Sequence, residues 1–170
     1  MKKLLLLTLV FGALSATRPQ IELKLGYFRF GDHHLRKVYR QDALDTQLTA
    51  SIPLWKWLNL YTGISYISRE GRTRPKHHHT KITILPLSLG LRAIVRVAHD
   101  VDYYLALGPR YFYVHQKHHS NHNTLGGFIN TGFLVHFRKN LFIDFFSEYS
   151  LSSSPQVGGL TVGGGMGYQF

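Results

Sequence analysis

Histidine is the residue type whose spacing in this chain most clearly suggests chemistry. Nine of the eleven histidines lie in three stretches, residues 33–34, 77–79 and 115–122. Neutral imidazole binds Zn, Cu or Ni, so stretches brought together in space could form a transition-metal site. The candidate ligands are His77, His78, His79, His118, His119 and His122. They show no fixed ligand spacing, so the alternative is a polar rim that becomes cationic below about pH 6.5.

Basic residues share these stretches of the sequence. The candidate binding residues are Arg36, Lys37, Arg40, Arg69, Arg72, Arg74 and Lys76, with Lys81 and Lys117 beside them. Only Asp32, Asp42 and Glu70 offset them there, and the whole chain has a formal charge of +11. Such a surface attracts polyanions, here lipopolysaccharide phosphates or host glycosaminoglycans. Nucleic acid is not an expected partner, because the chain reads as an exported protein.

Catalytic chemistry has little support in the sequence. Acyl transfer needs a nucleophile, a base and an orienting acid close together. Ser120 and residues 152–154 offer hydroxyls, but no His-x-Ser pair lies on an outward strand face. We therefore predict neither catalytic residues nor a cofactor, and a lipid A-modifying enzyme is a minor alternative.

The elements that position these residues are β-strands. In the last stretch, residues 158–170, one face carries Leu160, Val162, Gly164, Met166 and Tyr168, and the other carries Thr161, Gly163, Gly165, Gly167 and Gln169. This alternation predicts a strand with one apolar face. An exposed apolar edge strand invites aggregation, whereas a closed barrel in lipid pairs its last strand with its first.

Seven further segments show the same alternation. Together the eight are residues 21–28, 44–52, 58–66, 85–92 (with a possible extension to 97), 103–113, 128–137, 141–151 and 160–170. Short and longer connections alternate along the chain, and charged residues within the strands fall on the face opposite the leucines. A soluble lipocalin-like barrel would show the reverse arrangement, so we predict an all-β, eight-stranded, antiparallel up-and-down transmembrane barrel. Pro86 and Pro109 are expected to interrupt their ladders.

The N-terminal residues read as a targeting signal. Residues 1–16 contain Lys2 and Lys3, an apolar run and then small residues, which predicts a secretory signal peptide followed by a barrel over residues 17–170. The chain contains no cysteine, so disulfides play no part. No run of 18 apolar residues follows that would predict a transmembrane helix.

Several motifs resemble those of a known class. They are Leu87-Ser-Leu-Gly-Leu-Arg92, Tyr104-Leu-Ala-Leu-Gly-Pro-Arg-Tyr111, Gly126-Gly-Phe-Ile-Asn-Thr-Gly-Phe133, Phe146-Ser-Glu-Tyr149 and Tyr168-Gln-Phe170. With them the chain resembles the small eight-stranded outer-membrane barrels of the OmpA-barrel, OmpX and opacity type. The resemblance implies a monomer in the outer membrane of a Gram-negative-type bacterium, in contact with its lipids and lipopolysaccharide. It also implies that Tyr168 and Phe170 form the signal for the barrel assembly machinery.

Charged residues on the inner strand face form a second candidate site. They are Glu22, Lys24, Asp45, Arg92, Arg110, Asp144 and Glu148. Side chains fill the interior of an eight-stranded barrel, so these charges must pair. Strand order predicts Arg110 with Glu148, and Arg92 with Asp144 or Glu22. The predicted function is a structural or surface-interaction role through basic, His-rich loops, with a narrow porin or metal capture as alternatives.

Overall fold

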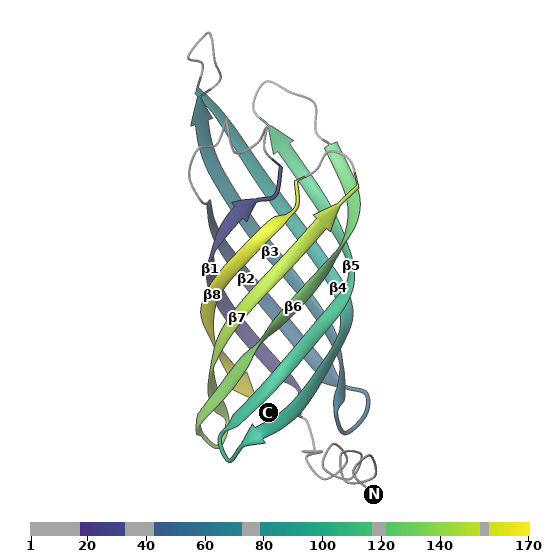
Figure 1. Cartoon of the computed structure of the whole chain (residues 1–170), viewed down its shortest axis with the longest axis vertical. Helices are drawn as coiled ribbons and strands as arrows, with labels where there is room; N and C mark the ends of the chain where they lie inside the picture. Colours follow the sequence, from purple (N-terminus) through teal and green to yellow (C-terminus); the bar gives the residue numbers. More distant parts are fainter. Residues whose placement is uncertain (1–17, 33–42, 73–78, 117–121, 154–156) are drawn as a thin grey trace, which may run out of the picture.

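The computed structural model confirms the predicted closed barrel (Figure 1). It describes residues 18–32, 43–72, 79–116, 122–153 and 157–170, so the predicted signal peptide, residues 1–16, lies outside the described residues. Every strand pairs antiparallel with its sequence neighbours, and β8 pairs with β1. The strands are β1 (Gln20–Phe30), β2 (Ala43–Pro53), β3 (Leu58–Arg72), β4 (His79–Ala98), β5 (Val101–Gln116), β6 (His122–Arg138), β7 (Leu141–Ser152) and β8 (Gly159–Gln169).

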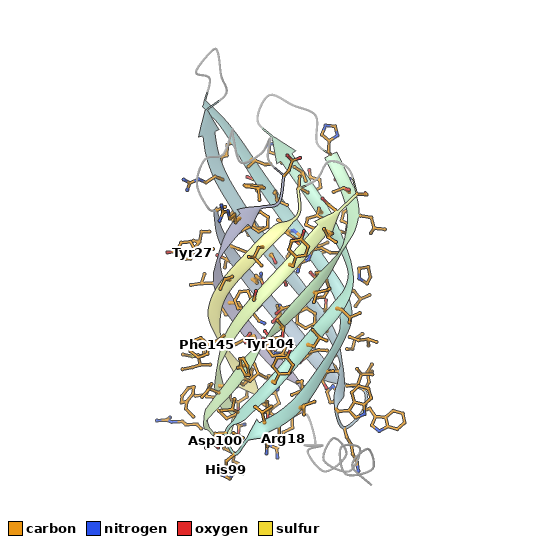
Figure 2. The ribbon with its side chains drawn as sticks, viewed as in Figure 1. Arg18, Tyr27, His99, Asp100, Tyr104 and Phe145 are labelled. Carbon is orange, nitrogen blue, oxygen red and sulfur yellow. The ribbon has the colours of Figure 1, made fainter. Side chains whose placement is uncertain are left out.

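The two faces of the barrel follow the alternation in the sequence. In β1 the burial pattern alternates strictly, with Leu23 and Tyr27 exposed and Glu22, Lys24 and Phe28 buried. Figure 2 shows the consequence, with Tyr27 and Phe145 pointing away from the barrel and Tyr104 lying inside it. Six aromatic side chains on the inner face are buried: Tyr61, Tyr104, Phe112, Phe128, Phe142 and Phe146. The barrel therefore has an apolar outside and a mixed interior.

The connections differ between the two ends of the barrel. Residues 54–57, 99–100 and 139–140 join their strands at the end where β1 starts and β8 finishes. The first of these turns is tight, because the backbone N–H groups of Leu54 and Trp55 both donate to the carbonyl of Leu58 at 2.9 Å. The short and longer connections thus alternate as predicted. We call these two ends the turn end and the loop end.

Several strands continue further toward the loop end than the sequence predicted. β3 reaches Arg72 rather than residue 66, β4 starts at His79 rather than 85, and β6 starts at His122 rather than 128. The prediction stopped where the apolar alternation stopped, but backbone pairing does not need apolar side chains. Arg69, Arg72, His79 and His122, assigned to loops from the sequence, therefore lie in strands.

The two prolines interrupt hydrogen bonding without ending their strands. The β3–β4 ladder breaks between Ile64↔Leu87 and Ile67↔Ile84, beside Pro86. The β4–β5 ladder breaks between Ser88↔Arg110 and Leu91↔Leu107, beside Pro109. Proline has no N–H to donate, so the loss stays local while the flanking pairs hold the strand in place.

The inner face of β8 is formed by glycines that let side chains of its two neighbours meet. Gly165 pairs with Lys24 of β1 on one side and with Asp144 of β7 on the other. Gly167 lies in the same way between Glu22 and Phe142. A Cβ at position 167 would overlap the ring of Phe142 and lie 2.9 Å from Cγ of Glu22. The glycines therefore leave the room that the large inner side chains occupy.

This crowding gives a testable prediction for Gly167→Ala. The added methyl group forces Phe142 or Glu22 to move, so the free energy of unfolding should fall by about 1–3 kcal/mol. Urea unfolding of the protein refolded into lipid vesicles measures this value.

Gly127→Ala is the matched control, because a Cβ there meets only the carbonyl oxygen of Gly108, at 3.5 Å. Equal stability of the two variants would show that the inner face of β8 is not tightly packed.

Candidate functional site

The interior of the barrel is arranged in layers along its axis. An apolar cluster lies toward the loop end, formed by Phe28, Phe30, Ala43, Ile67, Ile82, Ile84, Phe112, Val114 and Val157. A second cluster lies toward the turn end, formed by Ile94, Tyr104, Leu134, Phe142 and Phe146. The charged residues predicted from the sequence lie between and beside these clusters, and all seven are at most 4% exposed.

One ionic group crosses the closing seam of the barrel. The Lys24 ammonium lies 2.9 Å from Glu22 Oε2 and 2.6 Å from Asp144 Oδ2. Arg92 forms an ion pair with the other carboxylate oxygen of Glu22. Of the two partners predicted for Arg92, Glu22 is therefore the one it contacts, and Asp144 is held by Lys24. The sequence alone places Lys24 inside the barrel but does not identify its partner. The sequence feature that could have indicated the contact with Asp144 is Gly165, the glycine of β8 that lies between the two residues.

Tyr104 extends this group across the barrel. Its hydroxyl accepts a hydrogen bond from Lys24 Nζ at 3.2 Å and lies within hydrogen-bond distance of Asp144 Oδ2 (3.0 Å) and Asn130 Oδ1 (3.1 Å). The Arg92 guanidinium lies 3.8 Å from the centre of the Tyr104 ring. A cation over an aromatic face is stabilised by the ring quadrupole. The aromatic ring thus contacts both cations of the group.

A second ionic group joins β5 and β7. Arg110 Nη1 donates to Glu148 Oε1 at 2.5 Å, which is the predicted pair, and Arg110 Nε donates to Ser88 Oγ at 2.8 Å. Asn130 Nδ2 donates to the other Glu148 oxygen at 3.1 Å. Each charge has a partner of opposite sign and further polar contacts, as burial requires.

Asp45 joins the lumen by hydrogen bonds rather than by an ion pair. Gln47 Nε2 donates to Asp45 Oδ2 at 2.7 Å, and Thr161 Oγ1 donates to the same oxygen at 3.0 Å. Gln47 also lies 3.4 Å from Glu148, so it links Asp45 to the second ionic group. Hydrogen bonds therefore connect the polar side chains of the lumen from β2 to β7.

The lumen leaves no water-sized passage past its central residues. Lys24, Arg92, Tyr104, Ala106, Asn130 and Asp144 are each 0% exposed. These residues come from β1, β4, β5, β6 and β7, and so from most of the barrel circumference. A water-filled channel would leave accessible surface on the side chains that line it. The arrangement is a packed polar core.

The surface candidates are only partly within the described residues. Arg36, Lys37, Arg40, Arg74, Lys76, His77, His78, His118 and His119 lie outside them, and only the backbones of Arg72 and His79 are described. His122 is exposed at the start of β6, and Arg69 is half-buried in β3. Within the described ranges, no three His, Cys, Asp or Glu side chains are grouped to hold a metal ion. The metal site and the basic surface stay predictions.

A third ionic cluster, at the turn end, was missed by the sequence reading. Asp102 of β5 contacts Arg96 Nε and His136 Nε2, each at 3.0 Å. Asp102 alternates with the outward Tyr103, so its inward direction could have been read from the sequence. Its partners could not, because the registers shift beside Arg96 and beside His136.

No protein-family model matches the chain. No curated protein matches it either. Solved structures do match it. OprG from Pseudomonas aeruginosa superposes with a TM-score of 0.68 at 12% identity, over 92% of this chain and 97% of that one. The fold is that of the small eight-stranded outer-membrane barrels.

Two further outer-membrane barrels show the same likeness. Ail of Yersinia pestis, in a crystal structure with the heparin analogue sucrose octasulfate, has a TM-score of 0.61 at 15% identity, covering 90% of this chain and 97% of that one. Neisserial surface protein A has a TM-score of 0.57 at 12% identity, covering 92% and 98%. No helix among the described residues is long and apolar enough to cross a membrane.

The position of Lys24 between two carboxylates predicts a large effect of Lys24→Met. Asp144 then loses its cation inside the barrel, so the free energy of unfolding should fall by about 3–5 kcal/mol. The double variant Lys24→Met/Asp144→Asn should recover part of this loss, because the unpaired charge is gone. Urea unfolding measures all variants, and Lys56→Met in an exposed turn is the matched control. A double variant as unstable as the sum of the single variants would contradict the pairing.

The packed core also predicts electrical behaviour. The purified protein should give no discrete conductance steps in planar lipid bilayers, because its central layer excludes water. Discrete steps that change on substitution of Arg110 or Glu148 would instead show that the lumen conducts ions.

Proposed function

We propose that this chain is an integral outer-membrane protein of a Gram-negative-type bacterium that binds anionic groups with its basic loop end. The observation that carries the proposal is the combination of a packed lumen with an apolar outer face. Because the interior of the barrel is closed to water, its two ends are the parts available for contact with other molecules. Of these, the loop end holds the sequence stretches richest in basic residues and histidine.

The outer face supports the membrane location. Leu23, Leu125 and Phe145 are 56%, 62% and 56% exposed, and similar side chains surround the barrel. Apolar patches of this extent are rare on soluble monomers, and they suit contact with hydrocarbon. Trp55 and Trp57 are exposed in the turn between β2 and β3, where amphipathic rings suit the headgroup level.

The route into the membrane is part of the same proposal. Residues 1–16 act as a cleaved signal peptide, and Tyr168 and Phe170 act as the signal for the assembly machinery. The two rings pack edge to face at 5.1 Å, and both are exposed on the outside. The Phe170 N–H donates to the Pro19 carbonyl at 3.0 Å. The barrel acts as a monomer, because its closed sheet has no free edge to recruit a second copy.

The loop end supplies the anion-binding charge. Arg29 of β1 and Lys81 of β4 are exposed near this end. The stretches listed above carry nine Lys and Arg residues against three acidic residues. Polyanions that such a surface attracts include the phosphates of neighbouring lipopolysaccharide and sulfated host polysaccharides. The structure of Ail with a heparin analogue supports the second possibility for a barrel of this fold.

Charge neutralisation at the loop end tests the proposal. Arg72, Arg74, Lys76 and Lys81, all changed to Gln, should weaken binding to immobilised heparin or to lipopolysaccharide vesicles by about tenfold or more, since each basic residue near an anionic surface contributes about 1 kcal/mol. Binding by the unchanged protein should weaken as salt is added. Surface plasmon resonance at two salt concentrations measures both effects.

A matched variant removes the same charges from the turn end. It changes Arg18, Arg138, Lys56 and Lys139 to Gln, again two arginines and two lysines, and should keep heparin affinity. Equal losses in the two variants would contradict a binding surface at the loop end. Recovery of the processed protein in soluble form without detergent would contradict the membrane location.

A further inference from the structure

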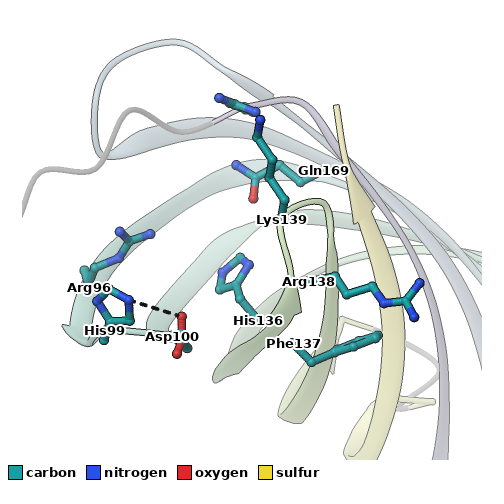
Figure 3. Close-up of a pocket in the computed structure, with 9 residues that line it drawn as sticks. Arg96, His99, Asp100, His136, Phe137, Arg138, Lys139 and Gln169 are labelled. Atoms are coloured by element: carbon teal, nitrogen blue, oxygen red, sulfur yellow. Dashed lines mark ion pairs between the residues drawn. The ribbon is translucent and has the colours of Figure 1, made fainter.

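The turn end of the barrel contains a pocket that the proposed function does not use. It has a volume of about 580 Å³ and is open to solvent. Four parts of the chain line it, namely Arg18 before β1, the β4–β5 turn with Arg96 and residues 99–100, the β6–β7 turn with residues 136–139, and Gln169 of β8 (Figure 3). The pocket is therefore a vestibule at the mouth of the barrel.

A buried carboxylate orients two of the side chains in the vestibule. Asp102 is 5% exposed, and it accepts a hydrogen bond from Arg96 Nε and contacts His136 Nε2, each at 3.0 Å. The His136 backbone N–H donates to the Asp100 carbonyl at 2.8 Å, which ties the two turns together. Asp102 contacts Arg96 through Nε, and within the described part of the chain no hydrogen bond uses the two terminal guanidinium nitrogens of Arg96. The site is held in place before any ligand arrives.

The remaining charges in the vestibule are unbalanced. Of the residues that the structure describes, no carboxylate lies within ion-pair distance of Arg18, Arg138 or Lys139. Among the described residues, Asp100 is the single carboxylate lining the pocket, and its side chain is 65% exposed, 3.9 Å from His99. Because Arg96 is already paired with Asp102, three further permanent cations among the described residues face one lining carboxylate. Cations gathered in this way repel one another, and a bound anion relieves the repulsion.

The geometry points to a phosphate-binding site in this vestibule. The planar guanidinium of arginine matches the oxygens of a phosphate group bidentately, and three of the four cations are arginines. Lys139 adds a mobile point charge at the rim. The phosphate belongs either to a soluble phosphorylated compound or to the headgroup of an anionic phospholipid. This inference uses the proposed membrane orientation only to place the site on the periplasmic side, and anion binding itself does not depend on that orientation.

Two binding measurements separate the two sources of phosphate. Isothermal titration of the protein in a phosphate-free, non-ionic detergent uses inorganic phosphate and glycerol 3-phosphate as probes. Native mass spectrometry of the protein released from nanodiscs compares retained phosphatidylglycerol with retained phosphatidylcholine. Saturable binding in the first assay supports a soluble ligand. Selective retention of phosphatidylglycerol without binding in the first assay supports a lipid headgroup.

Substitutions locate the binding. Arg138→Ala/Lys139→Ala should weaken whichever binding is observed by about tenfold or more, because it removes charge-assisted hydrogen bonds. Arg18→Ala should weaken it in the same direction, and it leaves the strands intact because Arg18 precedes β1. Lys56→Ala removes one charge from the turn end outside the vestibule, as Arg18→Ala does within it, and should leave phosphate binding unchanged.

Two outcomes would overturn the inference. One is the absence of binding in both assays, and the other is an equal loss in Arg18→Ala and Lys56→Ala. Heparin binding is measured on the same preparations. It distinguishes failure of the phosphate-binding inference from failure of the proposed function at the loop end. Loss of heparin binding in Arg29→Ala/Lys81→Ala, together with phosphate binding that Arg18→Ala weakens and Lys56→Ala keeps, supports both. Absence of heparin binding with phosphate binding intact removes the proposed function alone.

Discussion

Closure of the sheet is the constraint on which the rest of this structure depends. Every strand hydrogen-bonds to two neighbours, so the barrel leaves no row of free backbone groups at an edge. Hydrocarbon offers no hydrogen bonds, and a closed sheet with apolar side chains outside needs none from it. Period-2 alternation then sends every second side chain inward, whatever its chemistry. The inward charges of Glu22, Lys24, Arg92 and Asp144 follow from closure, and so does their need for partners.

The closing seam shows how packing meets that need. β8 offers glycine at the inner positions beside Lys24 and Asp144, so side chains of β1 and β7, two strands apart, meet directly over it. A larger residue on β8 would separate an ion pair that is buried from solvent. The glycine-rich strand β8 therefore has a specific steric role. The small inner side of β8 is what lets Lys24 of β1 reach Asp144 of β7.

The sequence predicted the architecture well, because alternation and connection length follow directly from strand geometry. It predicted Arg110 with Glu148, since the two lie at similar heights on strands that are two apart. It did not predict that Lys24 holds Asp144, because that contact depends on which strand separates them and how bulky it is. The strand extensions at Arg69 and His122 were missed because backbone pairing leaves no apolar signal. The cluster around Asp102 was missed because irregular register near a turn cannot be read from alternation.

The packed interior separates the two ends of the barrel, and its ionic groups are paired within it. The formal charges within each ionic group sum to zero, so these groups send little electric field to either end of the barrel. In the aqueous phase at each end, solvent ions screen the exposed charges over about 10 Å. The chemistry of each end can therefore be altered without retuning the other. The turn end and the loop end of one barrel can thus act independently, one on each side of the membrane that the barrel is proposed to span.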